Sequence, residues 1–307
     1  MENEYQLFRS IYIKNNSENI TKIMNTPNVS LEDIFDFKNS IQDTNIYICI
    51  HKSYKNENSI CLTSKLNSAN SIVYLVNKSK DFLDEYLQYY ILYYLKTKMN
   101  TLVKGLTNIY DISLIKKLEI PALSIDIQQF IINHINCNNE TINSNKMLIN
   151  NYKILKHNII KMNIQTNDNK YIMNITTLKN SNEMNEYVET ISIIKNGLKT
   201  GHVDYIQNCS VYNTNSYYIV LNTQEYKLKY IYYILDYNNN NIFNISNLKE
   251  QPLFTQYIFT SLQIPNVNSS IQDLIINKCE MYDNMITNCN QNIQKLNNEI
   301  IVFLTQI

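Results

Sequence analysis

The spacing of apolar residues predicts two long helices that face each other. Near the end of the chain, apolar residues alternate at steps of four and three, which is the spacing of a coiled-coil seam. This helix is predicted over 268–306, and its seam contains Ile275, Cys279, Tyr282, Ile286, Cys289, Ile293, Leu296, Ile300 and Phe303. An equivalent helix is predicted over 125–163, with a seam of Ile131, Ile135, Asn138, Ile142, Asn145, Ile149, Tyr152, Lys156 and Ile159.

Each of these helices needs an apolar surface to cover its own apolar stripe. Because both carry the same heptad register, we expect them to pair as an antiparallel coiled coil. The polar residues within the first seam lower stability but fix register and partner. The alternative is that the two helices are amphipathic covers of separate cores, which does not explain the strict heptad spacing.

A motif that occurs twice introduces both helices. The segment Ile120–Asn133 returns as Ile264–Asn277, an offset of 144 residues (264 minus 120) without a gap. In each copy, an extended Ile-Pro pair leads through a short polar turn to a Gln that opens an apolar helix, which is a helix-entry signal. The repeat therefore predicts a duplicated architecture.

Shorter patterns extend the duplication to the segments before the helices. Leu31–Ser40 matches Val188–Gly197, and Tyr90–Leu95 matches Tyr230–Leu235 at an offset of 140 residues (230 minus 90). Asp81–Met99 has helical apolar spacing. Clusters of β-branched residues predict strands at Ile46–Ile50, Ser59–Thr63, Ile72–Val76, His202–Ile206 and Tyr217–Leu221.

The predicted fold is therefore α/β (α+β), with two tandem globules that are each followed by a long helix. The domain boundaries predicted from these patterns are a first globule over 1–124, a first long helix over 125–165, a second globule over 166–267 and a second long helix over 268–307.

Composition excludes several classes of protein. The 307 residues suffice for two domains of about 100–200 residues each. Basic and acidic residues balance at 27 each, so no bulk charge indicates nucleic acid or membrane binding, and Arg9 is the single arginine. The acidic N-terminus does not resemble a signal peptide, and no apolar run is long enough to predict a membrane span. The scattered cysteines are therefore predicted to be reduced thiols of an intracellular, cytoplasmic protein.

The sequence contains no arrangement typical of catalysis or of metal binding. The four prolines are isolated, so the Pro-Pro pair with which an adenine methyltransferase holds a flipped base is missing, and the glycines do not form a P-loop. No ligand-like spacing surrounds the histidines, and on the first long helix we expect exposed polar positions. The four histidines are His51, His134, His157 and His202. We therefore predict no catalytic residues, no metal site and no cofactor.

In this duplicated order, the sequence resembles the specificity (S) subunits of type I restriction-modification systems. Ile112–Asn133 is similar to a characteristic segment of that family, in which a Leu-x-x-Ile-x-Ile-Pro strand leads through a Gln into a spacer helix. Leu31–Asn39 is similar to the opening Leu-x-Asp-Ile segment of the family. The resemblance covers nearly the whole chain from about residue 29.

The resemblance implies a function as well as a fold. In that family each globule is a target recognition domain that reads one half of a split site in double-stranded DNA. The paired helices set the spacing of the half-sites and dock adenine-methyltransferase subunits, with a nuclease subunit in some complexes. The chain would then be a non-catalytic specificity subunit of a DNA methyltransferase complex.

Lysines and polar residues near the predicted recognition elements are the candidate DNA contacts, because phosphates attract cations. They are Lys38, Asn39, Lys96, Lys98 and Lys104 in the first globule, and Lys195, Asn196, Lys199 and His202 in the second. The alternative for each lysine is ordinary surface charge, and Asn also favours turns. His202 follows a Lys-Thr-Gly turn and is a candidate phosphate contact or a solvated loop residue.

A second interpretation of the whole chain belongs to another class of function. The short globules, the balanced charge and the single arginine favour a structural or interaction protein that keeps the duplicated scaffold but has lost sequence-specific DNA binding. Methyltransferase activity within this chain is a third interpretation, disfavoured by the isolated prolines.

Overall fold

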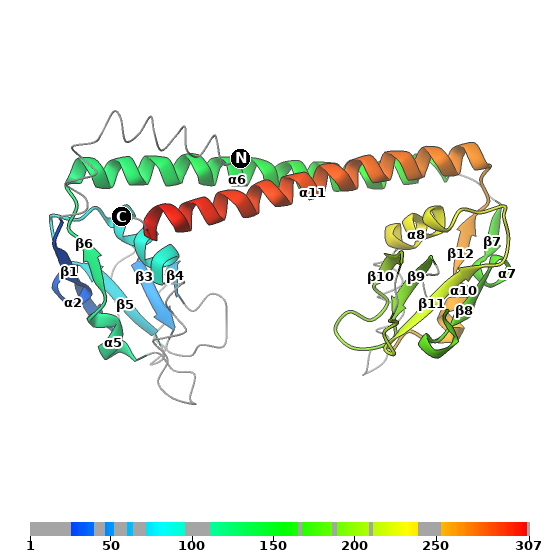
Figure 1. Ribbon diagram of the computed structural model, residues 1–307, viewed down its shortest axis with the longest axis horizontal. Helices are drawn as coiled ribbons and strands as arrows, with labels where there is room; N and C mark the ends of the chain where they lie inside the picture. The colour runs from blue at the N-terminus through cyan, green and yellow to red at the C-terminus, as the bar shows by residue number, and fades with distance from the viewer. Residues whose placement is uncertain are drawn as a thin grey trace. The chain divides into compact units, whose positions relative to one another are not determined.

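The computed structural model describes residues 26–39, 47–51, 60–63, 72–95, 111–164, 168–185, 189–208, 211–238 and 253–305 (Figure 1). The chain forms two compact units. Unit 1 comprises Met1–Ser144 and Asn292–Ile307, and unit 2 comprises residues 145–291. Each unit therefore contains one globule and one part of each long helix.

Unit 1 is built on a four-stranded antiparallel sheet of order β2-β5-β3-β4, with a second, two-stranded sheet of β1 and β6. Its strands are β1 Asn28–Ser30, β2 Phe35–Lys38, β3 Tyr47–His51, β4 Ile60–Thr63, β5 Ile72–Asn77 and β6 Glu119–Pro121. Its short helices are α2 Leu31–Ile34, α3 Asp84–Tyr89, a π-helical turn Tyr90–Leu95 and α5 Ile112–Lys116.

Unit 2 repeats this topology, with the order β8-β11-β9-β10 and a two-stranded sheet of β7 and β12. Its strands are β7 Asn169–Tyr171, β8 Thr176–Lys179, β9 Thr190–Ile194, β10 Val203–Ile206, β11 Ser216–Leu221 and β12 Gln263–Pro265. Its short helices are α7 Ile172–Ile175, a 3-10 turn Ser181–Glu183, α8 Leu228–Tyr237 and α10 Gln256–Ser261.

The internal duplication and the mixed α/β fold are confirmed, and the five predicted strands coincide with β3, β4, β5, β10 and β11. The predicted helix Asp81–Met99 is instead α3 followed by a π-helical turn that is described to Leu95.

The predicted match between Leu31–Ser40 and Val188–Gly197 is wrong. Leu31 opens α2, and its backbone N–H donates to the carbonyl of Leu118 at 2.8 Å. The same bond recurs between Ile172, which opens α7, and Leu262 at 2.9 Å, whereas Val188–Gly197 contains β9. Short strand segments of β-branched residues resemble one another at several alignments, so similarity over ten residues did not identify the true partner.

The offset of 140 residues predicted for the tyrosine-rich helices is also wrong. The Tyr86 hydroxyl donates to the carbonyl of Pro121 at 3.4 Å, and the Tyr230 hydroxyl donates to the carbonyl of Pro265 at 2.9 Å. Both residues of these pairs differ by 144 (230 minus 86 and 265 minus 121). The prediction was displaced by four residues, about one helical turn, because Tyr and Ile repeat at that spacing.

A buried glutamine ties each globule to its long helix. The Gln128 side chain accepts from the backbone N–H of Leu83 at 2.7 Å and donates to the carbonyls of Asp81 and Leu123 at 2.8 Å each. Gln272, 144 positions later, makes the same three bonds in unit 2. The side-chain amide of one glutamine thus forms hydrogen bonds with three backbone groups, which come from segments far apart along the chain.

The two long helices are α6 Ile125–Asn163 and α11 Ser269–Thr305, in agreement with the predicted spans. In unit 1, the ring of His134 lies 4.7 Å from that of Phe303, and in unit 2 the ring of Tyr152 lies 6.1 Å from that of Tyr282. The contact partners therefore have rising residue numbers along α6 and falling residue numbers along α11. The two helices run antiparallel, as predicted. None of the described helices is long and apolar enough to span a membrane.

The predicted seam residues are covered to different degrees. Those buried are Ile131, Ile135, Ile142, Ile149, Ile275 and Ile300, while Ile286, Ile293 and Leu296 are partly buried. The ends of the helices belong to the cores of the globules, since Ile300 and Leu304 lie in the core of unit 1 and Ile160 lies in that of unit 2.

We expect Gln128→Leu to lower the free energy of unfolding by about 2–4 kcal/mol, because it leaves a partly buried N–H and two buried or partly buried carbonyls without their partner. Chemical denaturation followed by circular dichroism measures this change. Gln129→Leu is the matched control, since Gln129 is exposed and bonds only locally to Asn133. Equal stability of the two variants would contradict the proposed role of the buried amide.

Candidate nucleic-acid interface

The loop between β9 and β10 brings together the four candidate residues of the second globule. β9 and β10 pair as an antiparallel hairpin, in which Val203 lies opposite Ile193. Residues 195–202 connect the two strands, so Lys195, Asn196, Lys199 and His202 share one loop at one end of the sheet.

Two glycines and a buried threonine give this loop a defined shape. Gly197 and Gly201 have φ angles of 98° and 80°, in the left-handed region that favours glycine. The fully buried Thr200 donates from both its backbone N–H and its hydroxyl to the carbonyl of Gly197, at 3.1 and 2.7 Å. The N–H of Gly201 then donates to the carbonyl of Ile194 at 2.8 Å, which closes the hairpin.

Lys195 is committed to contacts within the protein. Its ammonium group donates to the Asn180 side chain at 3.0 Å and to the carbonyl of Thr214 at 3.1 Å, and lies 4.4 Å from the centre of the Tyr217 ring. Its backbone carbonyl accepts from the N–H of Phe254 at 2.8 Å. The sequence analysis gave Lys195 as a candidate DNA contact, with ordinary surface charge as the alternative; in the structure its side chain also holds the loop to the sheet.

The tip of the loop, formed by Leu198 and Lys199, is exposed. Leu198 is 99% exposed, and the neighbouring Lys199 is also exposed. The His202 ring lies 3.4 Å from the Asp204 carboxylate, and the two attract each other when the ring is protonated. The loop therefore presents an apolar tip next to a lysine.

A second lysine at this end of the sheet escaped the sequence-based prediction. Lys179 is the last residue of β8 and lies opposite Tyr218 of β11, while Asn180 accepts the bond from Lys195. Glu183 lies close by, and the backbone N–H of Asn180 lowers the pKa of its carboxyl group. A sequence signal for Lys179 was available. Both Lys38 and Lys179 end a strand that follows a short apolar turn.

The first globule has fewer described candidates. Lys38 ends β2, and both Lys38 and Asn39 are exposed. Because β2 corresponds to β8 in sheet order, Lys38 corresponds to Lys179 (38 plus 141). The remaining predicted contacts, Lys96, Lys98 and Lys104, lie outside the described residues.

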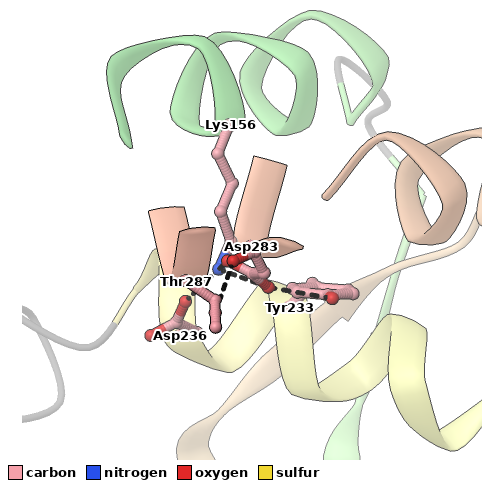
Figure 2. Close-up of polar contacts among 5 residues, drawn as sticks. All are labelled: Lys156, Tyr233, Asp236, Asp283 and Thr287. Atoms are coloured by element: carbon pink, nitrogen blue, oxygen red, sulfur yellow. Dashed lines mark hydrogen bonds and ion pairs between the residues drawn. The ribbon is translucent and has the colours of Figure 1, made fainter. Parts of the chain in front are cut away.

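A separate ionic cluster joins three helices of unit 2 (Figure 2). The ammonium group of Lys156 on α6 lies 3.1 Å from the Asp236 carboxylate on α8 and 3.0 Å from the Asp283 carboxylate on α11. It also lies 4.8 Å from the centre of the Tyr233 ring, whose hydroxyl donates to Asp283 at 3.0 Å. The Lys156 side chain is only 14% exposed, whereas the side chains of Asp236 and Asp283 are 32% and 38% exposed, so the lysine is largely shielded from water and the carboxylates are partly open to it.

Burial and charge act in opposite directions on these groups. Burial alone would lower the pKa of Lys156, but the attraction of Asp236 and Asp283 raises it overall, so the lysine is charged at neutral pH. Burial raises the pKa of the neighbouring Cys279 thiol to about 12. That thiol is therefore protonated at neutral pH and is a poor nucleophile.

Among the described residues, no group of three or more His, Cys, Asp or Glu side chains is placed to hold a metal ion. The two histidines of α6 both contact aromatic rings. His134 is half-buried rather than exposed as predicted, because it packs on Phe303, and burial lowers its pKa. His157 is exposed, as predicted, and its ring lies 4.3 Å from that of Tyr237.

We expect Lys195→Met to lower the free energy of unfolding by about 1 kcal/mol, because two hydrogen bonds and a cation–π contact are lost. Lys199→Met, four residues further along the same loop, should change it by less than about 0.5 kcal/mol. Urea denaturation of both variants measures the difference. A larger cost for Lys199→Met would show that these two lysines have been assigned the wrong roles.

The fold is similar to that of two solved structures. The S subunit of a type I restriction-modification system from M. genitalium matches with a TM-score of 0.54 and 15% identity, covering 92% of this chain and 96% of that chain. A structure describing complex assembly and conformational transition of a type I restriction-modification system matches with a TM-score of 0.55 and 10% identity, over 87% of this chain and 82% of that chain. No protein-family model and no curated protein matches the sequence. This chain therefore has the fold of type I restriction-modification S subunits.

Proposed function

We propose that this protein is a non-catalytic DNA specificity subunit, which binds a bipartite site in double-stranded DNA. The single observation that carries the proposal is the duplicated fold, in which two globules of identical sheet order are each followed by a long helix. Two equivalent globules suit two half-sites, and the paired helices suit a fixed spacing between them. Adenine-methyltransferase subunits, with or without a nuclease subunit, would supply the chemistry.

The described ends of the two sheets support the DNA-binding part of the proposal. Lys179 and Lys199 lie at one end of the second sheet, and Lys38 lies at the equivalent end of the first. Lysines in such positions neutralise phosphates, and polar side chains beside them read base edges.

The competing interpretation is a scaffold that no longer reads DNA. Several lysines of unit 2 are neutralised within the protein, where Lys170 pairs with Glu225, Lys227 with Asp273 and Lys229 with Glu280. These ion pairs reduce the positive potential available to a phosphate backbone. The DNA-binding experiment below therefore decides between the two interpretations.

A stripe of exposed apolar residues lies on the face of α6 away from the seam. Five apolar side chains of unit 2 are 41–71% exposed there, and they recur after seven or eight residues, about two helical turns. They are the adjacent pairs Met147 and Leu148, Ile154 and Leu155, followed by Met162. The same stretch of α6, residues 141–163, contains no acidic residue and has exposed lysines at 146, 153 and 161. We propose this apolar stripe as the docking site of a methyltransferase helix with an acidic, amphipathic surface.

The apolar stripe is one-sided, in the sense that α6 carries it and the equivalent positions of α11 do not. The positions of α11 that correspond to the first four stripe residues are Gln291, Asn292, Asn298 and Glu299, all of them polar. A shared requirement of both helices for solubility or folding does not explain why only one of them carries exposed apolar residues at these positions.

Selection of binding sites from random DNA duplexes, at fixed salt and with or without the candidate methyltransferase, tests the function. We expect split, A·T-rich half-sites, because Asn and Gln pair with adenine and the single arginine, Arg9, precedes the first repeat in the sequence. Lys199→Ala should reduce the slope of log K against log salt by about 0.9, whereas Lys278→Ala, on the exposed face of α11, should not. G·C-rich sites would refute the readout argument, and the absence of any enriched sequence would favour the scaffold.

The docking site is tested separately by Leu148→Asp. A carboxylate in the apolar stripe should weaken binding of the methyltransferase subunit about tenfold or more, as measured by calorimetry. Asn292→Asp introduces the same charge at the corresponding exposed position of α11 and should leave binding unchanged. Equal effects of the two substitutions would refute the one-sided site.

A further inference from the structure

The two helix ends that complete the globules differ in chemistry at one equivalent position. In unit 1, Ile300 of α11 is fully buried in the core. The equivalent position in unit 2 is Lys156 of α6, at the same 144-residue separation that relates the paired glutamines (300 minus 156). One turn further along, Leu304 and Ile160 are both apolar and 1% exposed. At this position one helix end is therefore apolar and the other charged, while the position one turn further along is apolar and buried in both.

The surface that receives each helix end is matched to it. In unit 2, Asp236 and Asp283 lie within 3.1 and 3.0 Å of the Lys156 ammonium group. The corresponding positions in unit 1 are Leu92 (236 minus 144) and Asn139 (283 minus 144), neither of which carries charge. The first globule thus has a receiving site for an apolar side chain, and the second has one for a cation.

Exchanging the helix ends would penalise both globules. Lys156 in the site of Ile300 would bury an ammonium group without the two carboxylates that pair with it in unit 2, which is costly. Ile300 in the site of Lys156 would leave Asp236 and Asp283 close together without a cation, so the like charges would repel each other. Such penalties on the wrong partner are what gives an interface its specificity.

We propose that Lys156 and Ile300 form a pairing determinant, which makes each globule accept only the helix end of the other repeat. It prevents two identical repeats, contributed by two copies of the chain, from pairing with each other. Two first repeats would place Lys156 against the apolar site, and two second repeats would place Ile300 against the carboxylates. This assignment concerns chain pairing alone and does not depend on DNA binding.

A chain that is cut after folding tests the proposal. A protease recognition sequence is inserted between Ile164 and Asp168, the intact protein is folded, and the connection is then cleaved. The first half contains α6, the second half contains α11, and native mass spectrometry identifies the pairs after prolonged incubation at several concentrations. For the unaltered sequence we expect pairs of one first half with one second half.

Single substitutions should redirect the pairing in opposite directions. With Ile300→Lys, each second half carries a lysine that meets Asp236 and Asp283 of another second half, so second-half homodimers should rise at least tenfold. With Lys156→Ile, each first half carries an isoleucine that fits the apolar site of another first half, so first-half homodimers should rise instead. A merely destabilising substitution would produce free halves, not a specific new pair.

Two further variants serve as controls. Val302→Lys adds the same charge to a partly exposed position of the same turn, 41% exposed, and should retain mixed pairs. Combining Ile300→Lys with Leu92→Asp and Asn139→Asp gives the first globule the carboxylates of the second. This triple variant should restore mixed pairs and recover most of a thermal midpoint that Ile300→Lys alone lowers by roughly 5–10 °C.

Three results would overturn the proposal: homodimers of the unaltered halves, mixed pairs in both single variants, or redirected pairing by Val302→Lys. If Ile300→Lys does not fold, Lys156→Ile and the triple variant decide the question. First-half homodimers and restored mixed pairs, respectively, would support the pairing determinant, and their absence would refute it.

Discussion

The bond network of one buried glutamine in each repeat holds the architecture together. Gln128 and Gln272 each connect the first turn of a long helix to the loop before a tyrosine-rich helix and to the turn that follows the Ile-Pro pair. A buried amide has a strong requirement for partners, so these bonds fix the direction in which the helix leaves the globule. The tyrosine hydroxyls that bond to Pro121 and Pro265 strengthen the same junction.

The long helices could be predicted from sequence because their periodicity extends over many turns. A seam of nine positions leaves little freedom in register, and the Ile-Pro motif marks where each helix begins. The antiparallel pairing followed from the shared offset. The alignment of the shorter elements failed, because the repeats differ in loop length and the offset changes from 141 residues at α2 and α7 to 144 at the glutamines.

The environments of the candidate site residues were harder to predict because distant segments of the chain form them. Lys195 was predicted as a DNA contact or as surface charge, but its ammonium group contacts Asn180 and the Tyr217 ring, which lie next to β8 and within β11. Lys156 looked like an imperfection of the seam, and its two carboxylate partners lie 80 and 127 residues away. Sequence separation of this kind leaves no local signal, whereas the exposed Lys199 retains the surface position assigned to it.

The way in which the long helices are shared between the units has a consequence for protein synthesis. Unit 2 is complete once residue 291 has been made, whereas unit 1, which starts the chain, also requires the segment from 292 onward. Ile300 and Leu304 are buried in its core, so the first globule emerges from the ribosome with part of its core missing. Domains generally fold in the order in which they are translated. Here the order of completion is reversed, and loss of the last helical turns would damage the globule encoded first.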